Sequence, residues 1–436
     1  MISLLGLVGA LALLIYLTIR GMNLLIAAPL TAMIVAVTGG LPLLPWEGVK
    51  EGTDFVNSYM SGFSGFIASW FFMFLLGSIF GKLMEDSGAA DSVANWVIGH
   101  VGMNNAVIAV VAACAVLTYG GVSVFVVAFS AYPMALSLFK QANLPRRFIP
   151  AVMGFGSVTF TMTSAGSPEI QNWIPIKYLG TSPFAAWEVS LVVAVFMMCF
   201  GYWWMRRMIS AAVANGEVFE ARDNDPIAGT DRELPHPGTA AIPLLAVLGV
   251  TFFFHEALRQ YALILALLSG CITAWAINAK LFTNLGLAIS AGTAGALLAI
   301  GNTAAVVGFG SVAKASPAFG LAVEYLTAIP GNELIGAAVA VTVIAALTGS
   351  ASGGQSIALP VLAPHYLDAG VDPEALHRVV AISSGALDSL PHNGYVVTTI
   401  RSICGETHQA AYAPMAALTV VVPLIGTVMA VCLLLL

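Results

Sequence analysis

The sequence predicts an all-helical integral membrane protein with many membrane spans. Of its 436 residues, 59% are hydrophobic and only 9% are charged, whereas a soluble domain carries roughly 25% charged residues. Apolar runs near the spanning length of about 20 residues recur along the whole chain. A single long polar stretch, 210–238, interrupts them. The charged residues are too few to cover the surface of a soluble protein of this size.

The same composition excludes several functional classes. The net charge is −6 and no basic stripe is present, so nucleic acid is not an expected partner. The five cysteines include no CxxC pair, which predicts neither a disulfide framework nor a metal site. No P-loop, GxSxG or HExxH motif occurs, so we expect no cofactor and no enzymatic activity, and an ATP-driven pump is excluded on this chain.

Several apolar runs are expected to be ordinary membrane spans. The first run is expected to be a retained span rather than a signal peptide, since nothing basic precedes it and Arg20 follows it. The polar stretch 210–238 is expected to be a cytoplasmic linker between two halves, 1–209 and 239–436. The apolar runs are 2–19, 22–39, 62–83, 187–206, 239–255, 261–279, 285–303 and 408–436.

The distribution of lysine and arginine predicts the orientation, because cytoplasmic loops carry an excess of both. If Arg20 is cytoplasmic, so are ten others, including Lys280 and the arginines of the linker. Both termini are then periplasmic, and the chain is a multi-pass protein of a bacterial inner membrane. Five basic residues fall outside or near the outer end, namely Lys50, Lys177, Arg259, Lys314 and Arg378.

Two apolar stretches, 105–140 and 332–368, do not behave as plain spans. The first is interrupted at 118–123 and the second at 348–354, both rich in glycine, serine and threonine. An arm of 14 to 17 residues extends only about 21–25 Å as a helix, too short to cross comfortably. We therefore expect two re-entrant hairpins with their tips inside the membrane.

A broken helix follows each hairpin. The segment 148–183 is interrupted at 164–168, and 374–402 is interrupted at 388–394. The element before each hairpin also matches, since Phe80 aligns with Phe309 at an offset of 229 residues. The ordered match predicts an inverted repeat with five spans and one hairpin in each half. Such repeats are typical of secondary transporters.

The tips and breaks predict where a solute binds. Irregular backbone at membrane depth persists only where it is buried in protein or lines a wet cavity, so the four features should converge. Half-helices expected to begin after Gly121, Gly354 and Gly394 present unpaired N–H groups that suit an anion. The candidate substrate-binding residues are Thr118, Gly120, Gly121, Ser123, Ser164, Gly166, Ser350, Ser352, Gly353, Gly354, His392 and Asn393.

Three residues are candidates for proton coupling: Asp388, His392 and Glu169. Asp388 follows the predicted half-helix 374–387, which places it about 20 Å into the membrane, where ionisable groups usually mark ion paths. His392 has a side chain that titrates near neutral pH. Alternatively, Asp388 caps the next half-helix, His392 is a hydrogen-bonded loop residue, and Glu169 is an N-terminal helix charge. Lys177 is expected to reach the outer surface, and His377 an interface.

Two motifs carry a family resemblance. The run 349–360, GSASGGQSIALP, and the run 388–394, DSLPHNG, resemble the gluconate permease family of the ion transporter superfamily. The second run is more similar to relatives assigned to 3-hydroxybutyrate. The resemblance implies proton-coupled uptake of a small hydroxycarboxylate by a homodimeric elevator, in which a transport domain of hairpins and broken helices moves against a scaffold of long spans.

The expected function is therefore symport of a small organic anion with a coupling ion, in contact with membrane lipid. Sodium is the alternative coupling ion, because the same hydroxyl and carbonyl groups suit either cation. A channel fits less well, since channels tend to build a pore from repeated subunits. An intramembrane enzyme lacks a catalytic motif here.

Overall fold

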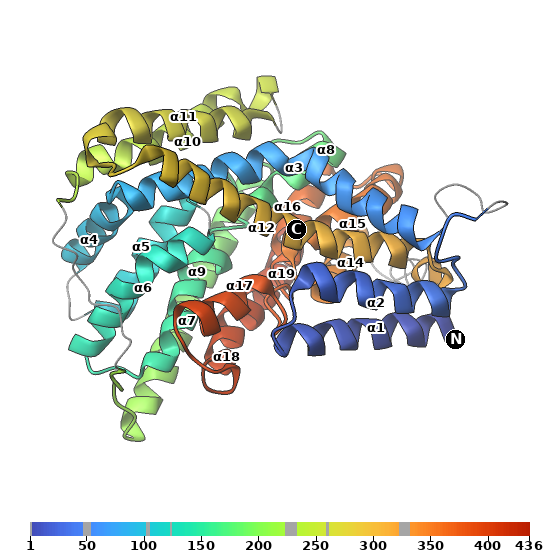
Figure 1. The fold of residues 1–436 in the computed structure, drawn as a ribbon, viewed down its shortest axis with the longest axis horizontal. Coiled ribbons are helices and arrows are strands. Elements are labelled where there is room, and N and C mark those ends of the chain that lie inside the picture. The colour runs from blue at the N-terminus through green and yellow to red at the C-terminus, as the bar shows by residue number, and fades with distance from the viewer. Residues whose placement is uncertain are drawn as a thin grey trace.

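The computed structural model describes residues 2–46, 54–101, 105–122, 124–222, 233–258, 261–321 and 332–436. Within these ranges every regular element is a helix, as predicted (Figure 1). By length and composition, six of the described helices can cross a membrane: Phe55–Asp86, Trp187–Ala214, Pro237–Leu258, Ala262–Leu281, Leu285–Ala315 and His408–Leu434.

Two long helices, α3 (Phe55–Asp86) and α12 (Leu285–Ala315), cross at the centre of a helical scaffold. A Cβ on Gly292 of α12 would lie 2.8 Å from the Cα of Ile79, so glycine is required where these backbones meet. Small residues allow such close approach between membrane helices. The Tyr59 hydroxyl adds a hydrogen bond to the Ala305 carbonyl at 3.0 Å.

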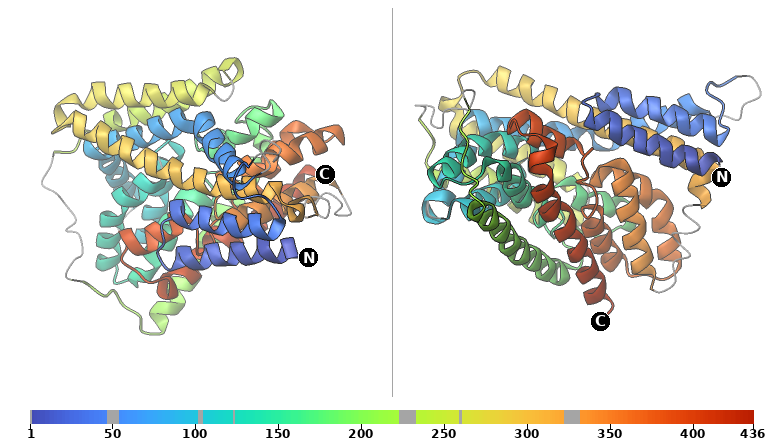
Figure 2. Two further views of the ribbon diagram at one scale, coloured as in Figure 1. Left: turned by 45° about the vertical axis from the view of Figure 1, so that its right-hand side comes forward. Right: turned by 90° about the horizontal axis from the view of Figure 1, so that it is seen from below.

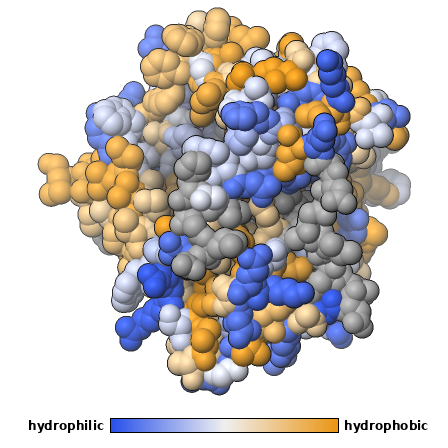
Figure 3. All heavy atoms as spheres, turned by 90° about the vertical axis from the view of Figure 1, so that its left-hand side faces the viewer, coloured by the Kyte–Doolittle hydropathy of each residue, from blue (hydrophilic) through white to orange (hydrophobic). Residues whose placement is uncertain are grey.

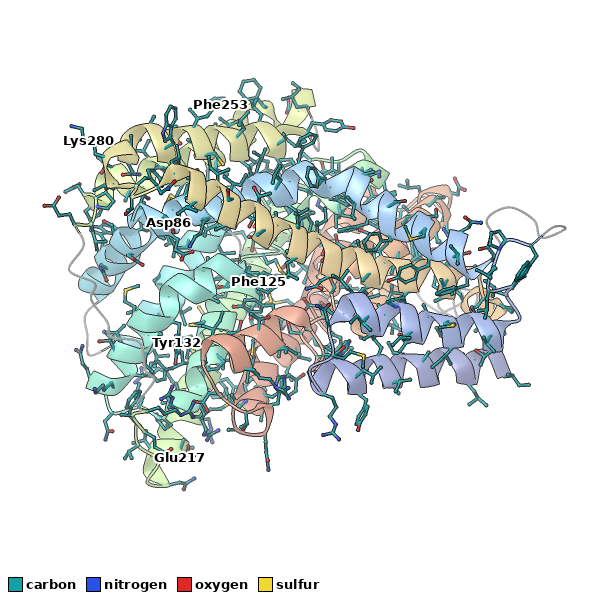
Figure 4. All side chains as sticks on the ribbon, viewed as in Figure 1. Asp86, Phe125, Tyr132, Glu217, Phe253 and Lys280 are labelled. Atoms are coloured by element: carbon teal, nitrogen blue, oxygen red, sulfur yellow. The ribbon has the colours of Figure 1, made fainter. Side chains whose placement is uncertain are left out.

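Two helix pairs flank this crossing. The pair α1 (Ile2–Ile19) and α2 (Leu24–Gly39) packs on α12, as both views of Figure 2 show. The pair α10 (Pro237–Leu258) and α11 (Ala262–Asn278) packs on α3. The outer face of α10 is apolar and open, with Phe253 79% exposed (Figure 4), as expected of a surface that meets lipid.

Both predicted hairpins are present as helix–turn–helix units. The first joins α5 (Ala106–Tyr119) to α6 (Val124–Gln141). The second joins α14 (Glu333–Thr348) to α15 (Ala351–Asp368). In each unit the two arms pack on each other.

Both broken helices are also present. In the first, α7 (Ile149–Gly154) continues as the π-helix Phe155–Thr159, and α8 (Ile174–Leu179) follows the break. In the second, α16 (Pro373–Ser384) precedes the break, and α17 (Gly394–Val397) continues as the π-helix Thr398–Ile403. The half-helix predicted to reach 387 ends at Ser384, because Gly385 and Ala386 close it with turn hydrogen bonds.

The packing partners in the two halves correspond. α2 lies on α12 as α11 lies on α3, and α15 contacts α8 as α6 contacts the π-helix after α17. The last elements also correspond: α9 (Trp187–Ala214) closes the first half, and α18 (His408–Ala416) with α19 (Val422–Leu434) closes the second. This order is the one that an inverted repeat requires, and its exact domain limits stay a prediction.

Charged side chains collect at one end of the molecule. Asp86, Glu217 and Lys280 lie at the same end in Figure 4, opposite the N-terminus. Figure 3 views this end, where hydrophilic residues gather between apolar flanks. α9 runs five residues into the predicted linker, and α4 (Ala89–Val101) covers part of the same end.

Ion pairs fasten the start of the linker to this end. Glu406, which is buried, accepts hydrogen bonds from Arg146 at 3.0 Å and from Arg222 at 2.9 Å. Arg147 makes two bonds to Glu217, at 2.6 and 2.8 Å. The Arg147 guanidinium beside Glu217 holds the pKa of that carboxyl below its usual value.

We expect Glu406→Gln to lower the unfolding temperature in detergent far more than Glu217→Gln does. The Glu406 side chain is 5% exposed, and removing one partner of a buried ion pair costs about 3–5 kcal/mol. The Glu217 side chain is 38% exposed, and exposed pairs contribute about 0–1 kcal/mol. Thermal unfolding of the two purified variants measures the difference, and equal small shifts would show that the Glu406 network is not structural.

Candidate functional site

The tip of the second hairpin is built by Gly349 and Ser350. Gly349 has φ of 57°, a conformation that favours glycine, and Ser350 caps α15 by accepting the Gly353 N–H at 3.1 Å. The helix therefore begins at Ala351, and the expected start after Gly354 was wrong. Gly353 and Gly354 lie in the first turn instead, where a Cβ on Gly354 would lie 2.6 Å from the Cα of Ala345. The Ser352 side chain is buried beside Ser350, with their Oγ atoms 3.3 Å apart.

Asn393 ties this tip to the second break. Its amide nitrogen donates to the Gly349 carbonyl and to the Asp388 carbonyl, each at 3.1 Å. Its amide oxygen accepts the Val396 N–H at 3.0 Å and so caps α17. Asn393, and not Asp388, is therefore the cap of the following half-helix. One side chain fixes the relative position of the tip, the break and the helix.

The carboxyl group of Asp388 is buried beside the start of α15. Ser389 donates a hydrogen bond to it at 2.9 Å, and the backbone amide of Ala351 lies within reach. No lysine, arginine or histidine of the described residues forms an ion pair with it. The Tyr412 hydroxyl holds the adjacent loop by donating to the Ser389 carbonyl at 3.2 Å. A charged carboxylate in such a place is costly unless a cation or a proton accompanies it.

His392 lies against the same tip without a hydrogen bond. Both ring nitrogens are buried, and neither has a partner within the described part of the chain. A Cβ at position 349 would lie 2.4 Å from Cδ2 and 2.5 Å from Nε2 of the ring, so only glycine leaves room for it. The backbone of Ala346 lies near the ring, so both roles considered for His392, loop residue and binding residue, stay predictions. The imidazole is available to a ligand or a proton.

Arg378 organises the first break, a role that was not predicted from the sequence. The side chain is fully buried on α16 and donates to the carbonyls of Thr163 at 2.7 Å, Ala185 at 2.9 Å and Pro183 at 3.2 Å. It also donates to the Asn172 side chain at 2.9 Å. From the lysine and arginine distribution, Arg378 was expected outside or near the outer end. An arginine inside a membrane half-helix is the signal that could have identified it.

His377, predicted to be interfacial, is fully buried as well. Its Nδ1 lies 2.6 Å from the hydroxyl of Thr181. The prediction was wrong because α16 packs on α8 and α14, so that its first turns are inside the protein rather than at a surface. A second side chain of α16 thus reaches the segment that follows α8.

Glu169 lies within the first break. Its side chain is half-buried and makes no hydrogen bond or ion pair to any residue that the structure describes. It precedes the short helix Ile170–Asn172 but makes no capping bond with it. Nearby, Gly166 has φ of 77°, and a Cβ there would lie 2.6 Å from the ring of Phe184. Glu169 therefore has no protein partner in the described ranges, whereas Asp388 accepts a hydrogen bond from Ser389.

Gln355 joins the second hairpin to both breaks. Its amide nitrogen donates to the Gln171 carbonyl at 2.9 Å and to the Ser384 hydroxyl at 2.8 Å. Its amide oxygen is buried and finds no partner among the described residues. Gln355 was not predicted as a site residue, because no spacing rule marks a glutamine in an apolar helix.

The tip of the first hairpin contacts the first break and the scaffold. The Tyr119 hydroxyl donates to the Ala165 carbonyl. The Thr118 hydroxyl is buried and without a partner among the described residues. A Cβ on Gly120 would lie 2.7 Å from Leu244, and one on Gly121, where φ is 91°, 3.0 Å from Val247, so both glycines face α10. The predicted residue Ser123 lies outside the described residues.

A cavity of about 960 Å³ lies between α5, α9 and α10 and is almost wholly apolar. It reaches the first break at Ser164, whose hydroxyl donates to the Phe160 carbonyl. An apolar cavity does not suit a carboxylate. No cluster of three His, Cys, Asp or Glu side chains occurs in the described ranges, as a transition-metal site would need.

The arrangement suits binding and proton exchange. Four features that are distant in sequence meet through named hydrogen bonds, and they leave two carboxyl groups, an imidazole and a threonine hydroxyl without strong partners among the described residues. Residues 12–363 match the family of citrate transporters, CitMHS.

The chain belongs to this family.

Curated relatives agree with the family. The chain is 34% identical over 455 residues to the uncharacterized transporter YxjC of Bacillus subtilis, with 94% of each chain covered. It is 23% identical over 353 residues to an uncharacterized transporter of Haemophilus influenzae, with 80% of each covered. The crystal structure of the Alcanivorax borkumensis YdaH transporter, described as having an unusual topology, is similar in fold, with a TM-score of 0.51, 16% identity and coverage of 98% and 97%.

These matches make the chain a multi-pass membrane transporter. The citrate transporter family belongs to the ion transporter superfamily, so the resemblance noted in the sequence is confirmed at that level. Membership of the gluconate permease family itself is not shown.

Gly349→Ala should abolish uptake and lower the unfolding temperature, whereas Gly353→Ala should do neither. Position 349 has positive φ, which costs about 1–3 kcal/mol for other residues, and the new methyl group would displace His392. At position 353 the nearest atom is the Ser350 Cβ at 3.2 Å, a contact that needs only a small shift. Uptake by a Gly349→Ala variant at the normal rate would show that the tip tolerates another arrangement.

Arg378→Lys should destabilise the protein although it keeps the charge. A lysine cannot reproduce the fork of donors that serves four acceptors, and each buried acceptor left unpaired costs about 1–3 kcal/mol. Arg401→Lys, at an exposed arginine, is the matched control and should leave thermal unfolding unchanged. Similar melting curves for the two variants would contradict the role given to Arg378.

Proposed function

We propose that the chain is a secondary active transporter that carries a small hydroxycarboxylate together with protons. The family supplies transport, and its name points to citrate, which is itself a hydroxycarboxylate. The observation that carries the rest is the buried group formed by Asp388, His392 and the start of α15. Gluconate-like and 3-hydroxybutyrate-like anions remain in the proposed substrate class, because the site offers hydroxyls and backbone amides rather than a shaped charged pocket.

The anion is proposed to bind at the tip of the second hairpin. The N-terminus of α15 directs the positive end of the helix dipole at this tip, which attracts negative charge, although Ser350 already accepts the Gly353 N–H. The hydroxyl groups of Ser350 and Ser352 flank that turn, and the unpaired imidazole of His392 is a donor on its other side. Hydroxyl and carboxylate groups of one small solute would use these two kinds of donor together.

Asp388 is proposed as the proton carrier. Its carboxyl group has no cationic partner among the described residues, so a proton or a bound cation is needed to offset its charge. His392 follows Asp388 by four residues in the same break, and the two groups are proposed to titrate as a coupled pair. Glu169, also without a partner in the described ranges, is the second candidate at the equivalent break.

The movement is proposed to be of the elevator type. The hydrogen bonds of Arg378, Asn393 and Gln355 join both breaks and the second hairpin into one unit. That unit meets the crossing of α3 and α12 mainly through packing contacts. We further propose a homodimer in a bacterial inner membrane, with the linker in the cytoplasm and both termini periplasmic.

Asp388→Asn should abolish accumulation of substrate against a gradient while permitting exchange across the membrane. Asparagine keeps the shape of the side chain but cannot carry the proton. The measurement is proton flux during citrate and 3-hydroxybutyrate uptake by proteoliposomes, in sodium-free buffer, with and without an imposed pH gradient. His392→Ala should instead raise the substrate concentration needed for half-maximal uptake.

The control is Glu169→Gln, which should retain coupling if Asp388 is the carrier. Wild-type proton-to-substrate ratios in Asp388→Asn would transfer the role to Glu169. Uptake that requires sodium and ignores the pH gradient would replace the proton by Na⁺ as the coupling ion.

A further inference from the structure

A second cavity lies away from the tip. It is between the scaffold helices α3 and α12 and the unit formed by the second hairpin and both breaks, which we call the hairpin unit. Its volume is about 290 Å³, close to the lower limit of about 300 Å³ for small-molecule sites. Its walls come from α3 and α12 on one side and from α8 and α15 on the other, elements that lie together in the right-hand half of Figure 1. The polar residues of these walls include Ser61, Ser69, Lys177, Ser311, Lys314 and Ser356.

The lining is cationic. Lys177 enters from α8 and Lys314 from the last turn of α12, and no carboxylate of the described residues lines the cavity. Serine hydroxyls surround the two lysines on several sides. Both lysines are exposed to solvent, so an anion can approach them, and two neighbouring positive charges favour a bound anion.

Neither lysine is neutralised by the described part of the protein. Lys177 donates to the hydroxyl of Ser69 at 3.1 Å, which is a neutral acceptor. Lys314 forms no ion pair with a described residue. Lys82, by contrast, contacts both Glu85 and Asp86 at 2.9 Å. The cationic charge of this cavity is therefore open to a ligand.

One wall of the cavity is α15, the helix that begins at the hairpin tip. Ser356 lines the cavity, and its buried hydroxyl has no hydrogen-bond partner among the described residues. Ser356 and Ser350 belong to the start of the same helix, and six residues of helix span about 9 Å. The part of the cavity wall formed by Ser356 therefore lies within two helical turns of the tip along α15.

We propose that this cavity is an accessory binding site for a carboxylate anion, occupied before the anion reaches the tip. Lys177 and Lys314 supply the charge, and the hydroxyls of Ser69, Ser311 and Ser356 supply hydrogen bonds. That the anion is the transported solute rests on the proposed function, whereas the binding of carboxylates here does not. Because the two lysines come from opposite sides of the interface, the bound anion bridges the scaffold and the hairpin unit.

The test uses the substitution Ser61→Cys at an exposed position, with the exposed Cys199 and Cys432 replaced by serine. The full-length purified protein is treated with an anionic or a cationic methanethiosulfonate, and the ratio of the two rates reports the local potential. Replacing both Lys177 and Lys314 by glutamine should lower the anionic-to-cationic ratio on the order of tenfold at low ionic strength. About 1 M salt should abolish the difference, because charges are then screened within roughly 3 Å.

Three controls test whether the change in the rate ratio comes from the charge of these two lysines. Replacing both lysines by arginine keeps the charge and should retain the ratio, which excludes misfolding as the cause of a loss. Lys280→Gln, at an exposed lysine of the opposite end, should change nothing. Added citrate should slow the modification of the introduced thiol when the lysines are present and not in the double glutamine variant.

In proteoliposomes, the double glutamine variant should raise the citrate concentration for half-maximal uptake and leave the maximal rate nearly unchanged. An unaltered rate ratio, or citrate protection that persists without the lysines, would overturn the accessory site even if uptake is normal. Lysine-dependent protection in a protein that transports no hydroxycarboxylate would retain the site and overturn the proposed function instead.

Discussion

Backbone polar groups that no helix satisfies are the constraint on which this structure depends. Each broken helix exposes carbonyl and amide groups in an apolar interior, where an unpaired group is costly. Side chains from other elements satisfy them: Arg378 of α16 serves the first break, Gln355 of α15 reaches the same break, and Tyr119 of the first hairpin contacts Ala165. Because these backbone groups need hydrogen-bond partners, parts of the chain that are about 200 residues apart are held together as one unit.

The buried polar side chains that have no hydrogen-bond partner indicate where a ligand could bind. Most buried polar groups in proteins have a partner, so an exception needs an explanation. Among the described residues, the exceptions include the imidazole of His392, the hydroxyl of Thr118 and the hydroxyl of Ser356. They lie at the two tips and along α15, where a hydrophilic solute and a coupling ion would supply the missing partners.

The charges fall into two groups with different physical roles. At the polar end, Arg146, Arg222 and Glu406 neutralise one another and hold the start of the linker. Arg378 has only neutral acceptors, which spread its charge over carbonyl dipoles rather than cancel it. Lys177 and Lys314 are not neutralised by described residues at all, and they lie between the scaffold and the hairpin unit, where a mobile anion can enter.

The sequence by itself determined the helical membrane fold, the two hairpins and the two breaks, because hydropathy and glycine-rich interruptions are local properties. It also singled out Asp388, His392 and Asn393 as candidates, since ionisable and polar residues stand out in apolar segments. Tertiary structure alone decided that Asn393 caps α17, that Arg378 holds the first break, and that Lys177 and Lys314 share a cavity. Each of these facts is a contact between distant segments, and residue type and spacing do not encode which acceptor a side chain will meet.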